Sequence, residues 1–139
     1  MAQTQKPTNL GYGEIAKRMG TAGDATGSCV KSVVGLTGAC TAAEASTFAN
    51  PGGATKLAAN GFTLADADSV VSSTTTVTDD TVELDHVFTA SGDQSVSGFA
   101  IENDDDDVVY MECCFNAAVA AENGDTVTCE GKMQFKLGA

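Results

Sequence analysis

Hydrophobic and polar residues alternate most regularly in residues 125–137, near the end of the chain. The apolar set, at every second position, is Val127, Cys129, Gly131, Met133, Phe135 and Leu137. The residues between them are Thr126, Thr128, Glu130, Lys132, Gln134 and Lys136. A period of two places one set on each face of a β-strand. This segment is therefore predicted to be a half-buried strand, central in its sheet or paired late, which needs neighbouring strands and a covering layer.

Similar strand patterns, separated by turn residues, fill the chain from Phe62 onward. The predicted strands cover residues 69–78, 81–90, 96–102 and 107–115, and an Ala-rich stretch follows at 116–122. In the last of these strands, the phase expected to face the core consists of Val109, Met111, Cys113 and Phe115. The opposite phase, expected to point outward, consists of Tyr110, Glu112 and Cys114.

The first part of the chain has a different pattern. Residues 1–8 are a polar arm that Pro7 keeps extended. Apolar residues recur at helical spacing between positions 9 and 19, which predicts a short amphipathic helix. A strand is predicted at 29–34, and the capping-box pair Thr41 and Glu44 predicts a short helical turn at 41–49.

These patterns together predict a mainly β protein. We expect an antiparallel β-sandwich, of the jelly-roll or immunoglobulin-like kind, with a short N-terminal helix. At 139 residues the chain is long enough for one hydrophobic core. The expected organisation is a polar arm at 1–8 and a single β-rich domain at 9–139.

The charge balance limits the classes of partner. Nineteen acidic residues and seven basic ones give a formal net charge of -12. Such a surface repels phosphate backbones, so no nucleic-acid binding is expected, and it favours solubility in an extracellular or salty medium. The sequence has no apolar run long enough for a membrane helix and no signal-peptide core at its start, so neither membrane insertion nor conventional secretion is expected.

The five cysteines are Cys29, Cys40, Cys113, Cys114 and Cys129. Their number is odd, so at least one cannot pair within a monomer, and their spacing does not match a zinc site. Buried thiols are one interpretation, because cysteine packs as a small hydrophobe, and disulfides are the other. Cys113 and Cys129 share the core-facing phase and are the best intramolecular candidates. Cys114 points the opposite way and is a candidate for a bond between subunits.

Few residues are candidates for catalysis or metal binding. His86, the sole histidine, lies in the apolar phase of its strand, so we expect it to pack within the sheet rather than act as a general base. An acidic turn could ligate Ca²⁺ but lacks EF-hand spacing and is expected to be a solvated hairpin tip; it contains Asp104, Asp105, Asp106 and Asp107. Glycoside hydrolysis would need two carboxylates across a sugar cleft, usually beside aromatic residues, and the chain has no tryptophan. We predict no catalytic residue, metal or cofactor.

Several short sequence segments in the second half of the chain resemble segments of short structural proteins of tailed viruses, of the tail-fibre-like or virion accessory type. They are TTTVTDDTVEL at 74–84, FTASG at 88–92, GFAIEN at 98–103, VYM at 109–111 and NGDTVT at 123–128. The resemblance covers residues 69–137 and, loosely, 10–20. The chain departs from the family pattern in its acidic turn, in the Cys113-Cys114 pair and across 35–59. The resemblance implies a virion component without enzymatic residues.

We therefore expect a non-enzymatic virion structural protein of a tailed virus of bacteria or archaea, made in the host cytoplasm. It would decorate a capsid or form part of a collar, tail or fibre. Its expected partners are itself, as a trimer or higher symmetric assembly, and other virion proteins such as capsid or tail proteins. Lys6, Pro7 and Thr8 of the arm are candidates for reaching a neighbour. The alternative is a cell-surface or filament-forming β-sandwich subunit that joins its neighbours by strand addition, and a glycan-active enzyme is the third hypothesis.

Overall fold

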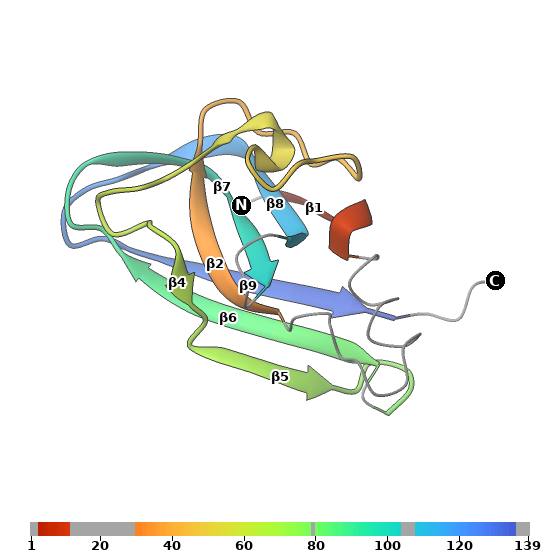
Figure 1. The fold of residues 1–139 in the computed structure, drawn as a ribbon. Coiled ribbons are helices and arrows are strands. Elements are labelled where there is room, and N and C mark those ends of the chain that lie inside the picture. The colour runs from red at the N-terminus through yellow and green to blue at the C-terminus, as the bar shows by residue number, and fades with distance from the viewer. Residues whose placement is uncertain (1–2, 12–29, 79, 104–107, 136–139) are drawn as a thin grey trace.

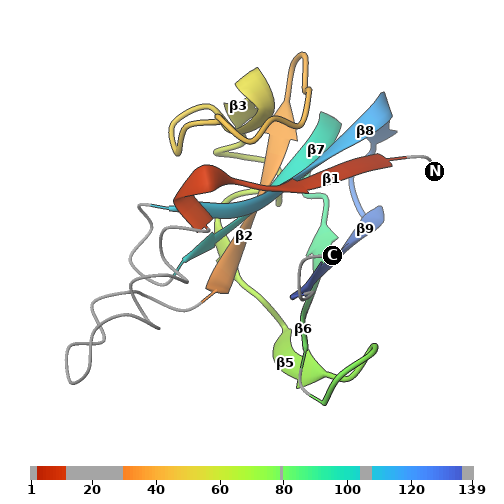
Figure 2. The ribbon, with the colours of Figure 1, turned by 90° about the vertical axis from the view of Figure 1, so that its right-hand side faces the viewer.

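Two antiparallel β-sheets pack face to face (Figures 1 and 2). The computed structural model describes residues 3–11, 30–78, 80–103 and 108–135. The six-stranded sheet contains, in spatial order, β1 (Gln3–Pro7), β8 (Val109–Ala121), β7 (Gln94–Asn103), β2 (Val30–Thr37) and then both β3 (Thr55–Lys56) and β4 (Ala65–Asp66) beside β2. The three-stranded sheet contains, in order, β5 (Ser69–Ser73), β6 (Thr81–Thr89) and β9 (Thr126–Gln134). The prediction of a mainly β, antiparallel sandwich is confirmed.

Aromatic rings hold the two sheets together. Phe88 of β6 stacks on Phe99 of β7 with ring centroids 5.3 Å apart, and Phe62 lies 5.5 Å from Phe88. All three rings are buried. Aliphatic residues of both sheets surround them, and these include Val33, Leu84, Val96, Ile101 and Met111. Burial of this apolar surface is the main stabilising contribution to the fold.

The alternation predicted at the end of the chain produces β9. Val127, Cys129 and Met133 face the core between the sheets, so the predicted phase is confirmed. Gly131 lies in the same phase, and an added Cβ there would come within 2.2 Å of the Ile101 Cδ1 atom. The strand is not central, however, because among the described residues it pairs with β6 alone and forms an edge of its sheet.

The outer face of the six-stranded sheet is covered rather than exposed. Residues 38–54, which we call the strap, run across it, and Phe48 and Ala54 of the strap pack against Val34, Leu36 and Val109. The prediction that Tyr110, Glu112 and Cys114 point to solvent was wrong, because all three are buried. Glu112 and Cys114 face the outer side, where the strap covers them. Val109, predicted to face the core, also packs beneath the strap, because the pairing of β8 with β7 shifts register beside it. Figure 2 shows the strap on the far side of this sheet from β6 and β9.

Two of the predicted element bounds also need correction. No helix forms at 41–49, where the chain makes turns, and a single 3-10 turn (Pro51–Gly53) follows instead. The backbone N–H of Ala43 and the Ser46 hydroxyl both donate to the Glu112 carboxylate, which replaces the internal bonds of a helix. The Ala-rich stretch at 116–122 is not a separate connection, since β8 continues through it to Ala121.

The polar arm is an integral strand of the described chain. β1 pairs antiparallel with β8 of the same molecule, with Lys6 opposite Glu112 and Pro7 opposite Met111. Thr8 is fully buried; its hydroxyl donates to the Val109 carbonyl and accepts a bond from the Gly11 N–H. A short helix begins at Asn9, as predicted, and its described part ends at Gly11.

Candidate interaction surfaces

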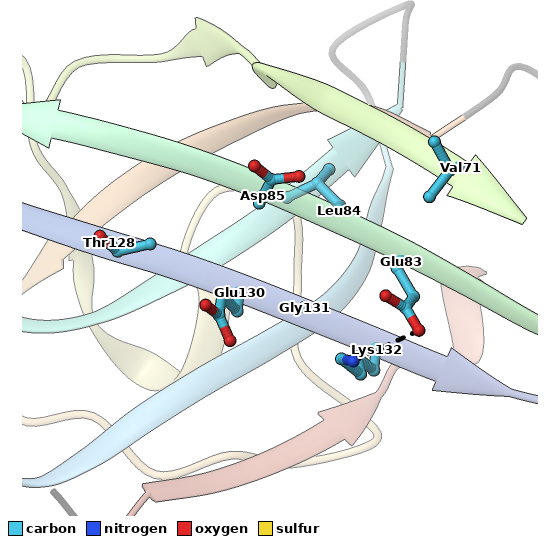
Figure 3. Close-up of a pocket in the computed structure, with 8 residues that line it drawn as sticks. All are labelled: Val71, Glu83, Leu84, Asp85, Thr128, Glu130, Gly131 and Lys132. Carbon is cyan, nitrogen blue, oxygen red and sulfur yellow. Dashed lines mark ion pairs between the residues drawn. The ribbon is translucent and has the colours of Figure 1, made fainter. Parts of the chain in front are cut away.

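A shallow groove of about 250 Å³ crosses the outer face of the three-stranded sheet (Figure 3). β6 and β9 form most of it, and β5 contributes Val71 at one side. The remaining lining residues are Glu83, Leu84, Asp85, Thr128, Glu130, Gly131 and Lys132. Alternation places these charged side chains outside because their neighbours, such as Leu84 and Cys129, fill the core.

The charges in this groove are only partly compensated. The Lys132 ammonium lies 3.3 Å from the Glu83 carboxylate, as Figure 3 shows. A hydrogen bond from the Ser73 hydroxyl, and secondarily Lys132, hold the pKa of Glu83 below its ordinary value. Asp85 and Glu130 lie directly opposite each other on neighbouring strands, where two like charges repel. The groove is therefore acidic on balance.

Exposed valines accompany these charges. Val71 and Val87 are each about half exposed on the outer side of the sheet. Val70 is also 42% exposed, although it is paired with the buried Leu84 and therefore faces inward. Within the described residues, β5 thus extends past the six-stranded sheet, which leaves the inward-facing Val70 partly exposed.

His86, the sole histidine, is not among the residues that line the groove. His86 lies in the opposite, inward phase; its ring packs edge-on against Phe88 and its Nδ1 atom is 3.3 Å from Asp68 Oδ2. Among the described residues, no three or more His, Cys, Asp or Glu side chains are grouped so as to hold a metal ion. Asp104, Asp105, Asp106 and Asp107 lie outside the described residues, so the calcium hypothesis stays a prediction.

A second hollow opens at the β9 edge, between the two sheets. This cavity of about 150 Å³, which we call the edge cavity, is lined by Gln3, Phe99, Cys113, Thr128, Cys129 and Glu130. Gln3 belongs to β1, which lies beyond β8 in the six-stranded sheet. Because β9 packs over Ile101 of β7 and Met111 of β8, β1 projects past it by about one strand.

The edge cavity decides between the two interpretations of Cys113 and Cys129. Both line it, as their shared phase suggested, and both are buried thiols, so the buried-thiol interpretation is confirmed for them and the possible disulfide between them is wrong. The Cys113 thiol donates to the Gln3 side-chain oxygen at 3.0 Å. Burial, together with Cys113 and Glu130, raises the pKa of Cys129 to about 12, so this thiol stays protonated at neutral pH.

Cys114 is not available for a bond between subunits, because it forms a disulfide with Cys40 of the strap. The sequence reasoning missed this pair because it placed Cys114 in solvent. A usable signal was present: β2 and β7 contain continuous apolar runs, VVGL and GFAI, which are typical of strands buried on both faces. Cys29 lies outside the described residues.

Two carboxylates beneath the strap were also missed. Glu112 anchors the strap as described above, and Glu102 of β7 forms an ion pair with Lys56 of β3. The Lys56 ammonium also lies 3.2 Å from the centroid of the Phe48 ring. Glu112 thus fastens the strap to the sheet directly, and Glu102 is linked to it through Lys56, which lies against Phe48 of the strap.

Comparison with known proteins gave no match, either to a family model, to a curated protein or to a solved structure. In the part of the chain that the structure describes, no helix has the length and apolar character needed to cross a bilayer.

Proposed function

We propose that this chain is a non-enzymatic structural subunit of a tailed virus, which works by packing against copies of itself and against other virion proteins. The observation that carries the proposal is the open three-stranded sheet. Its outer face mixes half-exposed valines with charges, and within the described residues its end strands β5 and β9 each pair only with β6. Open sheet edges and mixed apolar and charged faces are suited to repeated protein contacts.

The closed side of the molecule fits the same role. The strap, its disulfide and two buried carboxylates secure the outer face of the six-stranded sheet. A subunit built in this way exposes the outer face of its three-stranded sheet to neighbours, while the strap holds the outer face of its six-stranded sheet rigid. The resemblance of several sequence segments to structural proteins of tailed viruses favours a place in the capsid decoration, collar, tail or fibre.

Mass spectrometry of purified virus particles tests this proposal. The chain is expected in a fixed stoichiometric ratio to a major capsid or tail protein across independent preparations. Particles from which the chain is absent would overturn a virion role. Labelled antibody and electron microscopy of the same particles would then separate a capsid position from a tail position.

The same open edges favour a second candidate, a subunit of a cell-surface filament. Strand addition through β5 or β9 would extend such a filament without any virion protein. Detection of the chain in sheared surface filaments of uninfected cells, together with its absence from particles, would select this candidate.

A further inference from the structure

We infer that the chain assembles head to tail, with β5 of one copy adding beside β9 of the next copy and Val70 entering over the edge cavity. This inference deepens the proposed assembly role and rests on it. The occupant of the β9 edge is thus a second copy of this chain.

At each side edge of the sandwich one sheet projects past the other, and the projecting sheet differs between the two sides. On one side β1 of the six-stranded sheet projects past β9, and the edge cavity lies in the step. On the other side β5 of the three-stranded sheet projects, which leaves the inward-facing Val70 42% exposed. A projecting strand on one copy therefore fits the step on another, and the added strand would be the fourth of its sheet. In Figure 2, β1 and β9 both reach the right-hand side of the view, whereas β5 lies at the bottom.

The step also argues against a two-fold contact between two β9 strands. If β9 paired with its own copy, the two projecting β1 strands would be directed into the opposite molecule beneath the joined sheet. Among the described strands, none of the six-stranded sheet projects past β5, so β5 does not meet this obstacle. The contact is therefore heterologous, and such contacts generate closed rings or open filaments.

Charge favours the same two strands. The chain carries a net charge of -12, so two copies repel each other in general. β5 has no charged residue, and β9 carries one residue of each sign, Glu130 and Lys132, of which Lys132 is paired with Glu83 of β6. By contrast, β1 carries Lys6 and Pro7, which discourage strand addition at its own edge.

The edges of the six-stranded sheet are complementary in the same arrangement. Lys6 is exposed on β1. At the opposite edge Asp66 of β4 and the nearby Asp68 are exposed, although they also lie 3.7 Å from Lys31 and 3.3 Å from His86, respectively. A head-to-tail contact brings these two edges toward each other. Because β5 and β9 both run antiparallel to β6, copies that keep the same orientation would pair β5 with β9 in parallel.

Two substitutions, one on each side of the contact between β5 and β9 of neighbouring copies, test the inference in the full-length chain. Val70→Lys places a charge on the projecting strand, and Gln3→Arg fills the step. Val77→Lys is the matched control, because Val77 is an exposed valine that lies between β5 and β6, outside both strands and outside the groove. Circular dichroism and thermal unfolding establish that each variant is folded before association is measured by sedimentation velocity.

The unmodified chain and V77K are expected to form the same oligomers, and V70K and Q3R are each expected to associate more than about tenfold more weakly. An equimolar mixture of V70K and Q3R should give a heterodimer, because one intact donor strand and one intact step remain. A monomeric unmodified chain, or folded V70K that associates like V77K, would overturn the inference. Neither result would remove the chain from virus particles, so the proposed virion role is judged separately.

Discussion

Single side chains decide local order at the turn between β5 and β6. The Asp80 carboxylate accepts hydrogen bonds from the backbone N–H groups of Thr75, Thr76 and Val77 and from the side chain of Gln134. These bonds hold the pKa of Asp80 far below its ordinary value of 3.8, and the bond from Gln134 contributes most to this lowering of the pKa. One carboxylate thus ties this turn to the end of β9.

Asp80 predicts a specific dependence of stability on pH. A carboxyl with a depressed native pKa stabilises the fold fully above its unfolded pKa and loses that contribution as pH falls. We expect the free energy of unfolding to decrease as the pH falls below 3.8, the ordinary pKa of an aspartate. Asp80→Asn should lower stability at neutral pH and make stability depend less on pH in the acid range. Urea unfolding of both proteins between neutral and acid pH measures the effect; parallel curves would contradict it.

Gly131 makes a second prediction at this scale. Its missing side chain leaves space that the ends of Ile101 and Met111 occupy. Gly131→Ala should therefore destabilise the fold by about 1–3 kcal/mol through overpacking. Ile101→Val removes one of the crowded methyl groups, so the double variant should lose less stability than the sum of the two single changes. Chemical denaturation of the four proteins tests this, and simple additivity would count against direct crowding.

At the scale of elements, the strap has no regular structure to support it beyond one 3-10 turn. Its place on the sheet depends on side-chain anchors, which are the Cys40–Cys114 disulfide, Glu112 and the packing of Phe48. These anchors come from strands far away in the chain. An element of this kind cannot be recognised from its own periodicity.

Removal of the disulfide should lower stability strongly. The two cysteines are 74 positions apart. Closing so long a loop lowers the conformational entropy of the unfolded chain, which stabilises the fold by about 4 kcal/mol. Cys40→Ser, or reduction, should therefore lower the unfolding free energy by several kcal/mol. Cys129→Ser is a useful comparison, since it leaves the disulfide intact and changes only a buried thiol. Equal stability with and without reductant would contradict the assignment of a covalent anchor.

For the whole molecule, the sequence predicted the sandwich because alternation and turn residues are local signals. The core phase of β9 and the position of Leu84 and Phe88 in β6 follow from that alternation alone. What could not be predicted is the pairing of distant segments: β1 with β8, the strap over the six-stranded sheet, and Cys40 with Cys114. An outward phase in a strand shows which side chains face away from one layer, but it does not show whether a second layer covers them.

The adjacent cysteines of β8 give the disulfide a further meaning. Cys114 faces the strap and Cys113 faces the core, because neighbouring residues of a strand point to opposite sides. A slip of β8 by one position would present Cys113 to Cys40 and turn Glu112 and Cys114 into the apolar interior. The disulfide between Cys40 and Cys114 therefore forms only when β8 is in its correct register. Peptide mapping of the oxidised chain would distinguish these molecules from misaligned ones, in which Cys40 would pair with Cys113.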